Sequence, residues 1–175
     1  MKTILMSIGA EHNANIESGR KRAELRTRPP KCELPIRVFT YESGKRGRHK
    51  VTNEWICREM RTYTEGYYPS SLPDVACVPP SYIDKSTDNG KKDLTAMYIS
   101  DLVIYDKPRE LSDFIVPSKT GCCNEGKCRG CKYLDRGNGY NIEDDCNAKF
   151  STDDYKPLRR PPQSWCYVEV SENGT

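Results

Sequence analysis

Residues 68–77 read Tyr-Pro-Ser-Ser-Leu-Pro-Asp-Val-Ala-Cys and form the most directional pattern in the chain. An aromatic residue and a proline are followed by small residues, an aliphatic, an acid and a cysteine, which is unlike ordinary loop composition. Trp55 precedes this stretch, and a second tryptophan, Trp165, stands directly before Cys166. We interpret the pattern as part of a secreted signalling ligand stapled by disulfides.

The composition agrees with that interpretation. A chain of 175 residues is long enough for one domain with tails. Ile, Leu, Val and Phe make up about 17% of it, less than the roughly 20% of an ordinary folded domain, yet the net charge is only +3, unlike that of disordered chains. The nine cysteines therefore indicate that crosslinks replace missing hydrophobic burial, in an oxidising compartment.

Residues 1–31 are polar and charged without apolar periodicity, and we interpret them as a flexible basic N-terminal tail. Residues 1–10 begin with a basic side chain and hold a short apolar stretch, interrupted by Ser7, at the lower limit for a signal peptide. A signal-peptide remnant and a disordered start both stay open. Residues 19–22, Gly-Arg-Lys-Arg, are either a weak processing site or a solvated basic cluster. No apolar run approaches membrane-spanning length, so no membrane insertion is expected.

The apolar patterns that follow predict an all-β domain over residues 32–175. Alternating side chains predict a strand at 36–41, and a basic, glycine-containing turn at 42–50 separates it from a second strand. The clearest strand spans 94–105, is apolar on both faces and is expected to bulge at Ser100 and Asp101. Two further strands are predicted at residues 55–63 and 165–170.

Trp55 and the Tyr-Pro-Ser…Cys pattern of residues 68–77 resemble the motif of the interleukin-17 cytokines, and residues 89–105 resemble that family's Asp-Gly loop and central strands. The resemblance implies a cystine-knot-like fold of antiparallel strands, an extracellular homodimer and a cell-surface cytokine receptor. It also implies a disulfide between Cys77 and Cys166. The family has a second cysteine on each side of this connection, and here Tyr82 and Val168 stand near those places.

Receptor contacts are expected from two parts of the sequence. Trp55, Tyr68 and Pro69 are candidates from the motif, although Trp55 and Tyr68 could equally pack in the core. The basic turn adds Arg46 and Arg48, for which binding of a sulfated glycan and a purely solvated turn are the alternatives. Because the net charge of the whole chain is small, no nucleic-acid partner is expected.

The remaining cysteines admit more than one use. An odd number in a secreted protein suggests an intermolecular bond through Cys32 or Cys57, with a free buried thiol as the alternative. Residues 119–156 form a cysteine-rich insertion, in which disulfides are preferred to zinc because the compartment is taken to be oxidising. That preference depends entirely on the secreted location. The insertion holds Cys122, Cys123, Cys128, Cys131 and Cys146.

Together these features predict a secreted interleukin-17-like cytokine. The alternatives are another cystine-knot growth factor, of the neurotrophin or Spätzle type, and an intracellular zinc-binding interaction protein. His12 and His49 lie apart from any second catalytic signal, so neither an enzyme nor a cofactor is expected, and no metal site is assigned. Asn173 begins a glycosylation sequon at the end of the chain.

Overall fold

The computed structural model describes residues 1–117 and 155–170. Strands predominate, with three short helices and one 3-10 turn at Leu111–Asp113. The elements are β1 (Lys2–Gly9), α1 (Ala10–Glu17), β2 (Ala23–Arg26), β3 (Ile36–Ser43), β4 (Val51–Tyr63), α2 (Leu72–Ala76), α3 (Pro80–Ser86), β5 (Leu94–Arg109), β6 (Phe114–Pro117), β7 (Tyr155–Pro157), β8 (Trp165–Tyr167) and β9 (Glu169–Val170).

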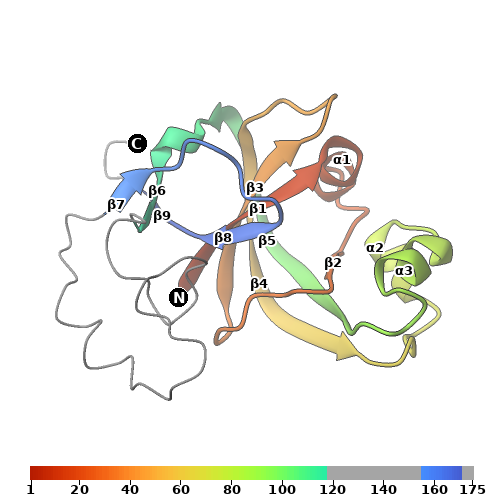
Figure 1. The fold of residues 1–175 in the computed structure, drawn as a ribbon. Coiled ribbons are helices and arrows are strands. Elements are labelled where there is room, and N and C mark those ends of the chain that lie inside the picture. Colours follow the sequence, from red (N-terminus) through yellow and green to blue (C-terminus); the bar gives the residue numbers. More distant parts are fainter. Residues whose placement is uncertain (118–154, 171–175) are drawn as a thin grey trace, which may run out of the picture. The chain divides into compact units, whose positions relative to one another are not determined.

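The chain divides into two compact units. The first contains residues 1–111 and 160–168, and the second contains residues 112–159 and 169–175. A six-stranded sheet in the order β2-β5-β4-β3-β1-β8 builds the first unit, and its strands curl into a half-barrel (Figure 1). In the second unit β6 pairs antiparallel with β7 and β9, and Phe114 is buried there. The predicted predominance of β-structure is therefore confirmed.

Strand β1 lies inside the six-stranded sheet. It pairs parallel with β3 along its whole length and antiparallel with β8 near Leu5. Ile4, Leu5 and Met6 are all fully buried, although neighbouring side chains point to opposite faces. A strand buried on both faces reads as a continuous apolar run rather than an alternating one. The segment considered as a signal-peptide remnant or a disordered start is thus a core strand.

The rest of residues 1–31 is also folded rather than a flexible tail. Helix α1 follows β1 directly, and its buried side chains Asn13 and Ile16 lie three residues apart on one helical face. A polar helix with one large apolar anchor has no periodicity that could reveal it in the sequence. Strand β2 then pairs with β5 at the end of the sheet.

The central hairpin and the long strand follow the sequence-based expectations. Strands β3 and β4 pair antiparallel across the basic turn. A Cβ atom on Gly47 would lie 2.7 Å from the Ser43 carbonyl oxygen, so this tight turn needs glycine. In β5 the register against β4 shifts beside Asp101, whose φ is +48°. The predicted bulge is therefore confirmed.

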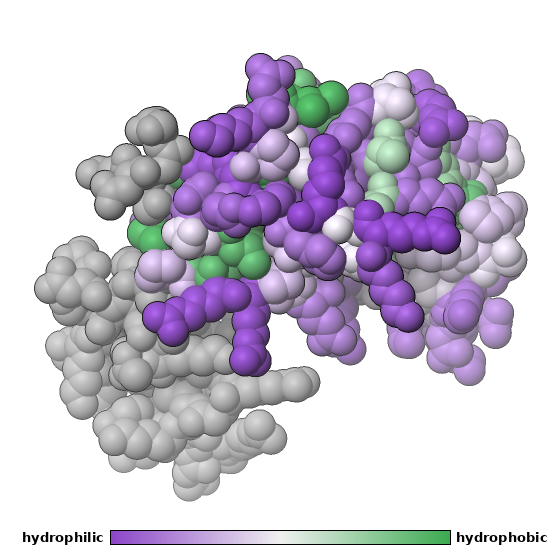
Figure 2. Space-filling view, turned by 90° about the horizontal axis from the view of Figure 1, so that it is seen from above, coloured by the Kyte–Doolittle hydropathy of each residue, from purple (hydrophilic) through white to green (hydrophobic). Residues whose placement is uncertain are grey.

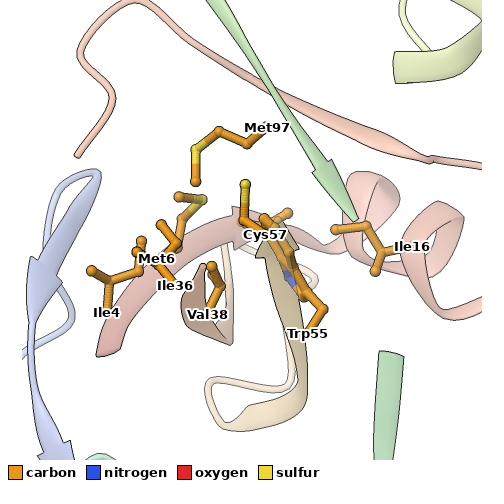
Figure 3. Packing of buried hydrophobic residues seen from close by; sticks show 9 residues of the cluster. Ile4, Met6, Ile16, Ile36, Val38, Trp55, Cys57 and Met97 are labelled. Carbon is orange, nitrogen blue, oxygen red and sulfur yellow. The ribbon is translucent and has the colours of Figure 1, made fainter. Parts of the chain in front are cut away.

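The core of the first unit lies on the inner face of the curled sheet. Side chains from four strands and α1 converge there, as Figure 3 shows for Ile4, Met6, Ile16, Ile36, Val38, Trp55, Cys57 and Met97. A second cluster lies between the sheet and helices α2 and α3, and it includes Ala23, Leu94 and Ala96 from the strands and Leu72, Ala76 and Ile83 from the helical segment. Burial of these side chains, worth about 1.5–3 kcal/mol for each large one, stabilises the unit without crosslinks.

The expected cystine knot was wrong. The four cysteines within the described residues, Cys32, Cys57, Cys77 and Cys166, are free thiols, so no disulfide joins strands in that part of the chain. Cys77 is the C-cap of α2 with φ +51°, and Cys166 lies on β8 opposite Leu5. The implied Cys77–Cys166 bond is therefore absent. Among the described helices, none is both long and apolar enough to cross a membrane.

Candidate functional site

Basic side chains are concentrated along β2 and the segments on either side of it. Residues 20–31 contain six basic side chains and one acidic one. The turn after α1 starts this segment, with Gly19 at φ +72° and the Lys21 amide donating to the Asn15 carbonyl over 2.8 Å. Pairing with β5, where Ala23 lies opposite Tyr98, then fixes the strand. Hydrophilic residues cover most of the described surface seen in Figure 2, so polarity alone does not distinguish a site.

Two charged side chains of this segment are buried side by side. Lys21 is 3% exposed and Glu24 is 7% exposed. The Lys21 ammonium lies 3.2 Å from one Glu24 oxygen and donates to the Ala76 carbonyl at 2.7 Å. Lysine and glutamate are rarely buried unless paired, because removing them from water costs several kcal/mol. Burial of these two charged side chains therefore depends on their pairing.

Arg26 connects this buried pair to two other segments. Its guanidinium lies 3.0 Å from the second Glu24 oxygen and donates to the Ser164 hydroxyl (3.1 Å) and the Ser7 carbonyl (3.0 Å). Its Nε is buried and has no hydrogen-bond partner within the described residues. One carboxylate thus serves two cations, and the cluster of Lys21, Glu24 and Arg26, which we call the β2 cluster, keeps an excess positive charge and one unused donor.

An aromatic pair stands next to the β2 cluster. Trp165 and Tyr167 of β8 meet edge to face with ring centroids 5.3 Å apart. The Trp165 indole donates to the Arg28 carbonyl at 2.7 Å, and the Tyr167 hydroxyl lies 3.5 Å from the Lys31 carbonyl. Neither ring is fully buried.

Three exposed basic residues lie on the segments that contact the two rings. The Lys2 ammonium lies 6.0 Å from the centre of the Tyr167 ring, and the residues Arg28 and Lys31 are exposed. No ion pair of these three side chains is found within residues 1–117 and 155–170. We call this group the β8 surface, and it consists of Lys2, Arg28, Lys31, Trp165 and Tyr167. It combines stacking faces with positive charge, the chemistry that unpaired nucleotides need.

Comparison with known proteins bears on the fold. No protein family matches the sequence, and no curated protein matches it. Three solved structures of an ASCH protein from Zymomonas mobilis do resemble the chain. The unmodified protein has 18% identity, a TM-score of 0.61 and coverage of 96% of this chain and 88% of its own. A serine-to-alanine variant has 17% identity and a TM-score of 0.61, with coverage of 96% and 89%. A tyrosine-to-phenylalanine variant has 21% identity and a TM-score of 0.55, with coverage of 63% and 77%.

These neighbours define an ASCH-like fold, and the assignment to the interleukin-17 family was wrong. The secreted cytokine and its cell-surface cytokine receptor were wrong with it, because their evidence was the cystine framework that the described structure lacks. The expected absence of a nucleic-acid partner was also wrong, because the likeness to the ASCH fold conflicts with it. The secreted location and the absence of catalysis stay predictions.

The candidate receptor contacts do not form one surface. Trp55 is fully buried in the core, where its indole donates to the Thr40 hydroxyl at 3.1 Å. Tyr68 is half-buried against the second cluster, and Pro69 beside it is exposed. Arg46 is exposed in the basic turn, whereas Arg48 binds the carboxylates of Glu17 and Glu42.

The cysteines also behave differently from the expectation. Burial raises the pKa of Cys57 and of Cys166 to about 11, so both thiols stay protonated and unreactive near neutral pH. Cys57 is fully buried and Cys32 partly buried beside the same core. The insertion cysteines and Asn173 lie outside the described residues. Within the described ranges, no group of three His, Cys, Asp or Glu side chains is placed to hold a metal ion.

Sequence reasoning missed Lys21, Glu24, Arg26 and Ser164. The Gly-Arg-Lys-Arg cluster looked like a solvated tail because β1 was not recognised as a strand. The available signal was the alternation after Lys21, where Ala23 and Leu25 face the second hydrophobic cluster and Glu24 and Arg26 face the other way. Recognising a strand at these residues would have placed Glu24 and Arg26 together on one of its faces.

Proposed function

We propose that this protein binds single-stranded RNA at the β8 surface, with the basic segment of residues 20–31 contacting the phosphates. The observation that carries the proposal is that both aromatic rings contact the backbone of the basic segment. The Trp165 indole donates to the Arg28 carbonyl, and the Tyr167 hydroxyl lies near the Lys31 carbonyl. The same contacts therefore position rings for bases and cations for phosphates. Likeness to the ASCH fold supports the same class of ligand.

Single strands suit this surface better than duplexes. Aromatic side chains stack on bases that are already unpaired, and each stacked base contributes about 1–3 kcal/mol. The bases of an RNA duplex are closed to such stacking, because they lie within its helix. The charge is local as well: the chain carries only +3 overall, but residues 20–31 hold six of its basic side chains. The proposal is of a binding protein, and it assigns no reaction.

Fluorescence anisotropy with a labelled, unstructured 12-nucleotide RNA tests the proposal. We expect binding that weakens as salt rises, and weaker binding of the same sequence annealed into a duplex. Trp165→Ala should weaken single-strand binding about 5- to 100-fold, the loss of one stacked base. Lys31→Ala should weaken it less and lower the salt slope by about 0.7, the value for one phosphate contact of a single strand.

The matched control is Lys92→Ala, which removes an exposed lysine in the loop before β5 and should leave both affinity and salt slope unchanged. Circular dichroism of each variant checks that it is folded. The proposal would be overturned if the wild-type protein failed to bind the RNA at low salt. Equal binding of the duplex together with an unaffected Trp165→Ala variant would overturn it too.

A further inference from the structure

A second group of aromatic side chains lies where β4 and β5 pair beyond the bulge. Arg61 stands opposite Ala96 and Tyr63 opposite Leu94, so these side chains share one face of the sheet with Tyr98. The Tyr63 and Tyr98 hydroxyls are 3.4 Å apart, and the Arg61 guanidinium lies 5.4 Å from the centre of the Tyr98 ring.

The tyrosine rings of this group pack against the core on one side and are accessible to solvent on the other. Tyr63 and Tyr98 pack on the second hydrophobic cluster and are only partly buried. Burial, followed by the hydrogen bond with Tyr98, raises the pKa of Tyr63 to about 12. Tyr67, at the turn that follows β4, is 77% exposed. We call Arg61, Tyr63, Tyr67 and Tyr98 the tyrosine surface.

Strand β2 connects the tyrosine surface to the proposed RNA site. Ala23 pairs with Tyr98, and the Ile99 amide donates to the Arg22 carbonyl at 3.0 Å. Arg22 is exposed and has no ion pair within the described residues. Arg26, three residues after Ala23 along β2, donates to the Ser164 hydroxyl beside the β8 surface. Three strand residues span about 10 Å, roughly the length of three stacked nucleotides.

We infer that the tyrosine surface is a second nucleotide-binding region, which holds bases of the same RNA strand after that strand crosses β2. This inference rests on the proposed function and extends its binding site. Strand β2 is the terminal strand of the sheet order, so a bound strand could pass over it from one face of the sheet to the other. Arg22 and Arg61 supply the positive charge, and the tyrosine rings supply stacking faces.

The contribution of this surface should depend on RNA length. A strand of 4 nucleotides fills the β8 surface and gains little from the tyrosine surface, whereas a strand of 10 nucleotides reaches both. The test is the ratio of dissociation constants for unstructured RNAs of these two lengths. We use the full chain and the double variant Arg61→Ala, Tyr67→Ala, because both side chains are exposed and their removal leaves the core intact.

The matched control is Arg58→Ala. Arg58 also lies on β4, and its side chain is 62% exposed, against 59% for Arg61. Each arginine pairs with an exposed acid, Arg58 with Asp101 and Arg61 with Glu59, but Arg61 also lies over the Tyr98 ring. We expect the double variant to bind the 10-mer about tenfold more weakly, the 4-mer almost as well as wild type, and the control to match wild type on both.

The outcomes separate this inference from the proposed function. If wild-type protein bound neither RNA, the proposed function would fail. If wild type bound both and Trp165→Ala weakened both, but the double variant matched wild type on the 10-mer, then the tyrosine surface would be no binding region and only this inference would fall. This inference would also fall if the double variant weakened binding of the 4-mer and the 10-mer equally, because the surface would then add no separate contact.

Discussion

Two clusters of paired charges, each with a buried acid, differ in their balance of charge. In the β2 cluster one acid, Glu24, serves two cations. In the other cluster, which we call the α1 cluster, two acids, Glu17 and Glu42, share the single cation Arg48. Burial of an acid therefore does not by itself identify a ligand site, since the sign of the net charge decides whether a cluster favours an anion such as phosphate.

The α1 cluster ties a helix to a hairpin. The Asn13 side-chain amide donates to Glu42 at 2.8 Å and to Thr52 at 3.0 Å, and the Asn53 side-chain amide donates to Asn13 Oδ1 at 2.7 Å. Arg48 closes the cluster from the basic turn through Glu42. These bonds join α1, β3 and β4, so we assign the cluster a structural role and keep RNA contact for the β2 cluster.

The largest expected effect is on the free energy of unfolding when Glu24 loses its charge. Glu24→Gln leaves Lys21 and Arg26 without a counter-charge, and breaking a buried pair in this way costs about 3–5 kcal/mol. Chemical denaturation should show that loss in the free energy of unfolding. Glu59→Gln, which changes an exposed acid on β4, serves as the control and should have little effect. An unchanged stability of Glu24→Gln would show that the β2 cluster is solvated.

Removing Glu42 should cost less. Glu42→Gln leaves Arg48 without its main partner, but the Arg48 side chain is 44% exposed and can turn to water. Loss of these hydrogen bonds should lower the free energy of unfolding by about 1–3 kcal/mol. A loss larger than that of Glu24→Gln in the same denaturation series would reverse the ranking of the two clusters.

The next largest expected effect is a loss of stability at low pH, caused by protonation of Glu42 in the α1 cluster. Burial by itself raises the pKa of Glu42, but hydrogen bonds from Arg48 and Asn13 outweigh it and hold the pKa below its ordinary value of 4.5. A lowered pKa in the folded state means that Glu42 stabilises the fold above its unfolded pKa and that this contribution is lost as pH falls through the folded pKa. Wild-type stability measured from pH 6 downwards should therefore decline below about 4.5 more steeply than that of Glu42→Gln. Parallel curves would contradict the lowered pKa.

The smallest expected effect is on the salt dependence of RNA binding, and it should differ between the two clusters. Arg22→Ala removes one exposed cation next to the β2 cluster and should reduce the salt slope of RNA binding by about 0.7, with unfolding unchanged. Arg48→Ala should do the reverse, lowering stability while leaving the salt slope as in wild type. Salt titrations of both variants decide the matter, and a reduced slope for Arg48→Ala would bring the basic turn into the RNA site.

The sequence revealed the parts of the fold whose pattern is local. Alternation exposed the β3–β4 hairpin, and the polar interruption at Asp101 marked the bulge of β5. Strand β1 stayed hidden because it is buried on both faces, which removes the alternation, and because it pairs parallel with β3, so no hairpin turn marks it. With β1 read as a tail, Lys21 and Glu24 could not be recognised as buried.

The cysteine pattern misled for a related reason. A cysteine count cannot distinguish crosslinked cysteines from free cysteines that pack as small apolar residues. Cys57 and Cys166 are free and largely buried. The Trp55 and Cys77 positions of the supposed cytokine motif have separate structural roles, one as a core ring and the other as a left-handed helix cap. Their spacing is explained by the turn and the short helix between them.

The pairing of β1 with β8 also constrains when this protein can fold. The Ser7 hydroxyl donates to the carbonyl of Pro162, 155 residues later. At a synthesis rate of roughly 5–20 residues per second, β1 waits about 10–30 seconds for that partner. During this time one edge of an apolar strand stays open to other chains. The protein thus carries a period of aggregation risk during synthesis, which the finished fold no longer shows.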